Sequence, residues 1–154
     1  MYTTEELARF PLLADLTESQ LERVGSLGHT VTFATGHRII EEGRPADRCW
    51  LIRSGRVALQ TPLPNNAAST VQTLGPGDVL GWSWLLAPYR WRFDGVATEP
   101  VEAIEIDAVQ LREFATHDCR LGYPLAMRLL EALADRLHGT RARLIDMYGS
   151  PRAS

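Results

Sequence analysis

Cysteine and long apolar runs are both scarce in this sequence. Only two cysteines occur among its 154 residues, Cys49 and Cys119, and they lack the spacing of a metal or redox site. No apolar run approaches the roughly 20 residues of a membrane-spanning helix, and residues 1–10 lack the apolar core of a secretory leader. These absences predict a cytoplasmic protein with reduced thiols and no membrane contact.

Positive charge is not in excess either. The formal net charge is −3 and the pI is about 5.8, a balance that disfavours a basic surface for nucleic acid. Hydrophobic residues make up 45% of the chain and charged residues 23%, which is enough apolar material for one globular core. We therefore expect a single domain over residues 1–154.

Signatures of catalysis are missing as well. The histidines do not cluster with a carboxylate as the metal ligands of a cupin-type enzyme would. Ser83 is not part of a Gly-x-Ser-x-Gly elbow, and no phosphate-binding P-loop is present. The sequence thus predicts a protein that is not an enzyme and holds no metal. A cupin-like metalloenzyme is the alternative from another class, because cupins are also double-sheet rolls.

The beginning of the chain has helical signals. Thr3 with Glu6, and Thr17 with Gln20, have the spacing of helix capping boxes. Residues 1–28 are therefore expected to contain two short helices.

The middle of the chain, residues 29–107, has β signals. Short runs of alternating apolar and polar residues are separated by glycine turns every eight to twelve residues or so. This pattern is typical of an antiparallel β-roll, a jelly-roll-like barrel of two sheets. The expected fold class is therefore α+β, with N-terminal helices, a β-roll and a long C-terminal helix.

Residues 108–149 are expected to form C-terminal helices. The longer one is predicted from about Pro124 to Tyr148, with the proline in its first turn. Apolar residues recur along it at heptad spacing. This heptad seam consists of Ala126, Leu130, Leu133, Leu137 and Leu144. Because the helix carries more apolar surface than a small roll needs, we predict a homodimer; packing of the seam on the chain's own roll is the alternative.

Glycine-containing segments connect these elements at a characteristic spacing. They are Gly43–Asp47, Trp50–Val57 and Leu74–Gly81. Together with the order of helices and strands, they resemble the cyclic-nucleotide-binding domain of the catabolite activator and fumarate-nitrate-reduction regulator superfamily, from Leu12 to about Tyr148. The resemblance implies a regulatory sensor module and, as a possible ligand, a cyclic nucleotide such as cyclic AMP.

Transcription factors of that superfamily continue into a helix-turn-helix domain. The sequence has no such segment after Tyr148, so we expect a stand-alone domain without direct DNA binding. Such a module would act through dimerisation and contact with a protein partner that the sequence does not identify.

The resemblance also places a phosphate-binding cassette at residues 81–96. In the family, a glutamate after the first glycine binds the ribose, backbone amides at a helix N-terminus face the phosphate, and an arginine neutralises it. Here Trp82 stands at the glutamate position, and Trp91 stands at the arginine position. Thr140 and Arg141 on the long helix match positions that reach the base. The candidate pocket therefore comprises Gly81, Trp82, Ser83, Arg90, Trp91, Arg92, Thr140 and Arg141.

Aromatic residues crowd this cassette, and they allow two interpretations. They fill the pocket as core, so that no nucleotide binds, or they line a retuned site for a flat ligand, with Arg90 or Arg92 as the charge partner. Use of either arginine for a true cyclic-nucleotide phosphate is a third possibility. The filled or retuned pocket is the preferred prediction, because the ribose carboxylate is replaced by an indole.

Overall fold

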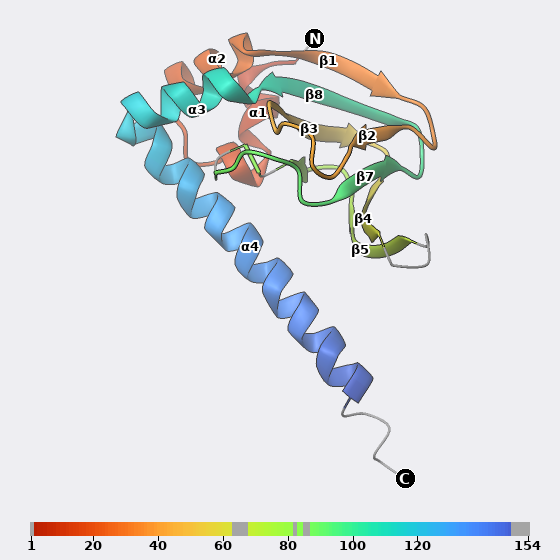
Figure 1. The fold of residues 1–154 in the computed structure, drawn as a ribbon. Coiled ribbons are helices and arrows are strands. Elements are labelled where there is room, and N and C mark those ends of the chain that lie inside the picture. The colour runs from red at the N-terminus through yellow and green to blue at the C-terminus, as the bar shows by residue number, and fades with distance from the viewer. Residues whose placement is uncertain (1, 63–67, 82, 85–86, 149–154) are drawn as a thin grey trace.

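The structure is a computed structural model that describes residues 2–62, 68–81, 83–84 and 87–148. Helices stand at both ends of the chain and strands between them (Figure 1), which confirms the predicted α+β class. The elements are α1 (Thr4–Ala8), η1 (Pro11–Leu13), α2 (Glu18–Ser26), β1 (Gly28–Phe33), β2 (Arg38–Ile40), β3 (Arg48–Ser54), β4 (Val57–Pro62), β5 (Ala68–Leu74), β6 (Val79–Leu80), β7 (Asp94–Ala97), β8 (Val101–Asp107), α3 (Ala108–His117) and α4 (Cys119–Tyr148).

The strands form two antiparallel sheets. One has the order β1-β8-β3-β6 and the other the order β2-β7-β4-β5. Among the described strands no ladder joins the two sheets, so the roll is a sandwich rather than the closed barrel that the sequence analysis described. Two of the four edge strands, β6 and β2, are only two and three residues long, which leaves little backbone there for closure between the sheets.

The predicted helix starts are present as caps. The Thr17 hydroxyl accepts from the backbone N–H of Gln20, whose side chain accepts in return from the Thr17 N–H. Thr3 accepts from the N–H of Glu6. Each cap satisfies a backbone donor that has no partner within its helix.

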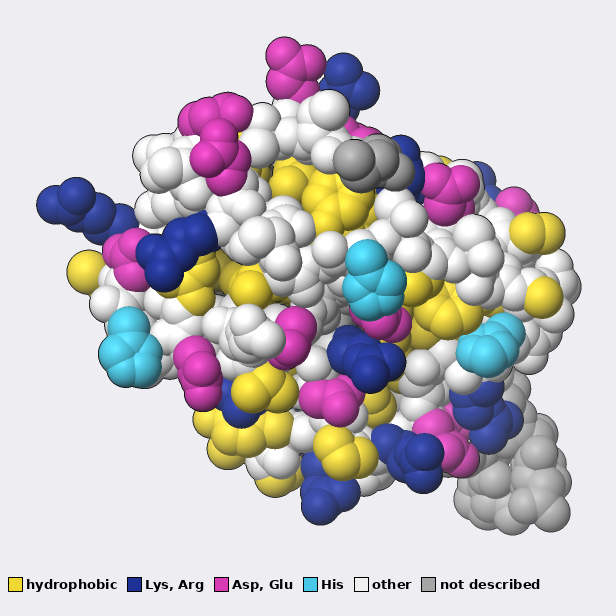
Figure 2. Space-filling view, turned by 90° about the horizontal axis from the view of Figure 1, so that it is seen from above, with side chains coloured by type: hydrophobic (Ala, Val, Ile, Leu, Met, Phe, Trp, Pro, Cys, Tyr) yellow, Lys and Arg dark blue, Asp and Glu magenta, His cyan; other side chains and the backbone are white. Residues whose placement is uncertain are grey.

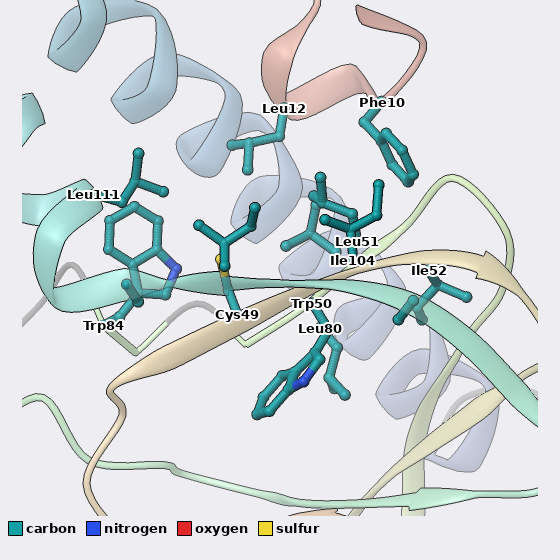
Figure 3. Packing of buried hydrophobic residues seen from close by; sticks show 14 of the residues in the cluster. Phe10, Leu12, Cys49, Trp50, Leu51, Ile52, Leu80, Trp84, Ile104 and Leu111 are labelled. Carbon is teal, nitrogen blue, oxygen red and sulfur yellow. The ribbon is translucent and has the colours of Figure 1, made fainter. Parts of the chain in front are cut away.

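The core extends to both faces of β3, where the sequence pattern predicted alternation between buried and exposed residues. Cys49, Trp50, Leu51 and Ile52 are all at most 5% exposed, because helices cover one face and the second sheet covers the other. Figure 3 shows Leu51 on the side of the N-terminal segment and Trp50 on the opposite side, beside Leu80. Strands buried on both faces lose the polar alternation that marks a half-buried strand.

The long helix α4 begins at Cys119, so the predicted start near Pro124 is wrong. Asp118 caps the start of the helix, since its carboxylate accepts from the Arg120 N–H and its carbonyl from the Leu121 N–H. Pro124 is inside the helix, where its ring removes one N–H donor. The helix packs mainly on α3 and η1, and its C-terminal end lies away from the sheets (Figure 1).

Surface charge is mixed on the face viewed in Figure 2, where acidic and basic side chains are interspersed. In the part of the chain that the structure describes, no helix has both the length and the apolar character to cross a bilayer.

Candidate functional site

The cassette starts at Gly81, directly after β6. Gly81 has a positive φ of 97°, a conformation that side chains other than glycine rarely adopt. A Cβ atom built there would lie only 2.7 Å from Cη2 of Trp91. The turn and the indole therefore fit each other closely, and a larger residue would displace the ring.

Trp91 points into the protein. It is 6% exposed, and its ring lies 6.0 Å from that of Trp50 at a tilt of 35°. Trp50 in turn donates its Nε1–H to the Glu105 carboxylate at 3.0 Å. A line of aromatic contacts thus runs from Gly81 through Trp91 to Trp50 and ends on an anchoring carboxylate.

Backbone hydrogen bonds hold the end of the cassette against the loop between β2 and β3. Trp91 donates to the Arg44 carbonyl and accepts from the Gly43 N–H, both at 2.9 Å. The Tyr89 carbonyl accepts from the Ala46 N–H at 2.8 Å. This clamp fixes the backbone of Trp91 and turns its side chain inward.

The two flanking arginines point outward. Arg90 and Arg92 are both exposed, and Nη1 of Arg90 donates to the Gly43 carbonyl at 2.8 Å. Arg92 has no hydrogen-bond or ion-pair partner among the described residues. Of the candidate residues, the structure thus brings Gly81 and Trp91 into contact, while Arg90 and Arg92 flank Trp91 in sequence but point outward. Ser83 is half-buried, and Trp82 lies outside the described residues.

Comparison with known families decides what kind of domain carries this cassette. A family described as the cyclic nucleotide-binding domain matches residues 30–118. This chain belongs to that family. The match spans the region from β1 to the end of α3, including the whole cassette.

Individual relatives of this cyclic nucleotide-binding domain include regulators. A CRP-like cAMP-activated global transcriptional regulator of Mycobacterium tuberculosis is 27% identical over 143 residues, which cover 93% of the chain and 62% of the regulator. Glutaminase 1 of Bradyrhizobium diazoefficiens is 30% identical over 143 residues, which cover 93% of the chain and 22% of that protein. The chain therefore spans less than two thirds of either relative.

Solved structures agree with the fold. One from Geobacter metallireducens GS-15, whose name refers to cyclic nucleotide binding, has a TM-score of 0.81 and 32% identity over 90% of the chain and 100% of that structure. A cyclic nucleotide-binding domain from Methylobacillus flagellatus has a TM-score of 0.79 at 18% identity, and the match covers 94% of this chain and 85% of that structure.

The domain's α3 helix contributes a residue that the sequence analysis missed. Nη1 of Arg112 donates to the Trp84 carbonyl at 2.7 Å, and its guanidinium lies 3.9 Å from the centre of the Tyr89 ring. Trp84 itself is 1% exposed, lies beside Leu111 (Figure 3), and its Nε1–H has no partner among the described residues. No local pattern marks Arg112, because an arginine on a surface helix is typical of a solvated face.

The domain's α4 helix carries two apolar stripes. Leu121, Leu125 and Leu129 are at most 4% exposed and pack in the chain's own core. Of the heptad seam, Leu130 is 58% and Leu137 is 67% exposed. Ala126 is also exposed and Leu133 half-buried, while Leu144, Thr140 and Arg141 have side chains outside the described residues.

Metal-binding groups do not gather in the described part of the domain, where no three histidine, cysteine, aspartate or glutamate side chains meet as ligands. His29 pairs with Glu105 at 3.2 Å, and His37 stacks on Phe33. Burial raises the pKa of the Cys49 thiol to about 12, which keeps it protonated and unsuited to metal binding near neutral pH.

Proposed function

We propose that this chain is a non-enzymatic regulatory domain whose cassette is filled by aromatic side chains, so that it does not bind a cyclic nucleotide in the manner of its family. The observation that carries the proposal is the burial of Trp91 against Gly81. The family resemblance assigns that position to the arginine that neutralises the phosphate.

The energetic argument concerns charge. A cyclic phosphate that enters a site shielded from water loses hydration worth several kcal/mol and needs a cation to compensate. The Trp91 indole supplies volume but no charge, and Arg90 instead donates to the Gly43 carbonyl. Trp82 replaces the carboxylate that would accept from the ribose.

Calorimetric titration with cyclic AMP and cyclic GMP tests this proposal. We expect no saturable heat up to millimolar nucleotide. Micromolar binding of either nucleotide would refute the filled cassette.

The second candidate function is true cyclic-nucleotide binding through Arg90 or Arg92. The observation in its favour is that Arg92 is exposed and unpaired among the described residues. If a cyclic nucleotide binds, the variants Arg90→Gln and Arg92→Gln show which arginine holds the phosphate, since loss of that arginine should weaken nucleotide binding at least tenfold.

We further propose that the heptad seam on α4 pairs with a second copy of the chain. Its support is the 58% and 67% exposure of Leu130 and Leu137, large apolar groups on a helix whose other stripe already serves the chain's own core. The dimer would then present the β-rolls to a protein partner, since regulation requires a recipient for the signal.

A further inference from the structure

A cavity of about 480 Å³ lies on the β2–β3 side of the contacts between Trp91 and Trp50. Its lining includes Trp50 and Trp91, but Gly81 is not part of it. Three arginines, Arg38, Arg44 and Arg48, line it as well. The volume is within the range of roughly 300–1,000 Å³ that small-molecule sites occupy.

The three guanidinium groups are only loosely paired. Arg38 and Arg44 share one carboxylate, Glu41, at 3.7 and 3.8 Å. These distances exceed those of hydrogen bonds. Both side chains are more than half exposed, so most of their N–H donors face water.

Arg48, the third arginine of the lining, also has a carboxylate partner that it shares with other groups. Arg48 lies 3.7 Å from Glu105, which already pairs with His29 and accepts from the Trp50 indole. Asp47 also lines the cavity. Among the lining residues, three arginines face the two carboxylates of Glu41 and Asp47. Glu105, outside the lining, divides its contacts among Arg48, His29 and Trp50, so each guanidinium group shares its carboxylate with another donor.

We propose that this cavity binds a small organic anion with a flat aromatic body. Trp50 and Trp91, which are 5% and 6% exposed, contribute an apolar base to the lining. Guanidinium groups at the rim bind carboxylate, sulfonate or phosphate oxygens as planar forks. The chain contains no lysine, so guanidinium is the only strongly basic side chain available for this role. The site goes beyond the proposed function, because it does not depend on what the cassette binds.

The occupant of this site would contact the cassette through one side chain. Trp91 lines the cavity and also lies over Gly81, and the clamp from Gly43 and Arg44 holds its backbone. Binding at the rim therefore changes the environment of an indole that belongs to the cassette. Tryptophan fluorescence reports this directly.

Naphthalene-2-sulfonate is a suitable probe, with the neutral 2-naphthalenemethanol as its counterpart. We expect calorimetry and tryptophan fluorescence to show saturable binding of the sulfonate that is about tenfold tighter than that of the alcohol. Arg44→Gln should weaken binding of the sulfonate about tenfold. Glu41→Gln should increase the affinity for the sulfonate roughly threefold, because two guanidinium groups lose a competing carboxylate. A variant that merely failed to fold could not show a higher affinity.

Arg56→Gln is the matched control. Arg56 is 56% exposed and pairs with Glu99 at 3.3 Å, yet it does not line the cavity, so its loss should leave the affinity for the sulfonate unchanged. The inference is overturned if the sulfonate fails to bind at millimolar concentration. It is equally overturned if Arg44→Gln and Arg56→Gln behave alike.

Competition separates this site from the cassette. Sulfonate binding that cyclic AMP displaces, and that Arg92→Gln weakens while Arg44→Gln does not, would place the probe in the cassette and refute the rim site. Sulfonate binding that Arg44→Gln weakens and Arg92→Gln leaves unchanged supports it, whether or not cyclic AMP binds. The sulfonate titration tests the rim site, and the cyclic-nucleotide titration tests the filled cassette, so either proposal can be refuted while the other holds.

Discussion

Truncation of the exposed leucines on α4 should dissociate the proposed dimer. Complete burial of a leucine side chain contributes roughly 2 kcal/mol. Leu130 and Leu137 are 58% and 67% exposed in the single chain, so covering both in each protomer of a twofold dimer contributes about 5 kcal/mol. Alanine keeps only a small part of that area. The Leu130→Ala/Leu137→Ala variant should therefore lose about 4 kcal/mol of association free energy, close to a thousandfold in Kd.

Sedimentation equilibrium over a range of concentrations measures this loss. Alanine is the best helix former, so the far-ultraviolet circular dichroism of the variant should match that of the parent and exclude unfolding of α4. Val109→Ala is the control, since Val109 is an exposed apolar residue on α3, at 38%, away from the heptad seam. A parent chain that is monomeric at about 100 μM, or a control that dissociates as strongly as the double variant, would refute the argument.

Three further predictions concern the cassette, the cap of α3 and the buried thiol of Cys49. The Trp82→Glu/Trp91→Arg variant introduces both polar groups that the resemblance expects in the cassette, and it should bind cyclic AMP in calorimetry, whereas we expect no binding by the parent. Asp107→Ala removes the cap that accepts from the first turn of α3 and should lower the free energy of unfolding by about 1 kcal/mol in a urea titration. Burial raises the pKa of Cys49 from 9.0 to about 12, so on raising the pH the thiol loses its proton in the unfolded chain before it does so in the folded one. The stability due to the neutral thiol is therefore complete below pH 9.0 and is lost as the pH rises towards 12. At pH 8, a thiol reagent should therefore label exposed Cys119 in the native protein, and Cys49 only after denaturation.

Features that depend on neighbours in the sequence were predictable. The capping box at Thr17 is formed by residues three positions apart, so the sequence contains everything that the cap requires. The two-sided burial of β3 could not be predicted in this way, because the helices that cover it come from distant parts of the chain. The start of α4 was predicted wrongly at Pro124, since the rule that places proline in a first turn competes with a cap at Asp118.

In the cassette, too, local features could be predicted from the sequence, whereas contacts between distant segments could not. The resemblance identified which residue types differ from the family, but it did not determine which side chains of Arg90, Trp91 and Arg92 point inward. That orientation follows from the backbone clamp with Gly43 and Arg44, a pairing between segments more than forty residues apart. Arg112 was missed for a related reason, since its role depends on a carbonyl in the cassette.

Contacts that need no ligand already connect the cassette to α4. Arg112 on α3 binds the Trp84 carbonyl and stacks on Tyr89, so α3 is tied to the cassette at two positions. The helices α3 and α4 approach closely, since a Cβ atom on Gly122 would lie 2.4 Å from the Ala115 carbonyl oxygen. Displacement of the cassette would therefore move α3, and α3 cannot slide along α4 without a clash. The aromatic filling proposed above, by fixing the cassette in one position, would thus fix the direction of α4, and with it the geometry in which the heptad seam would meet a second copy in the proposed dimer.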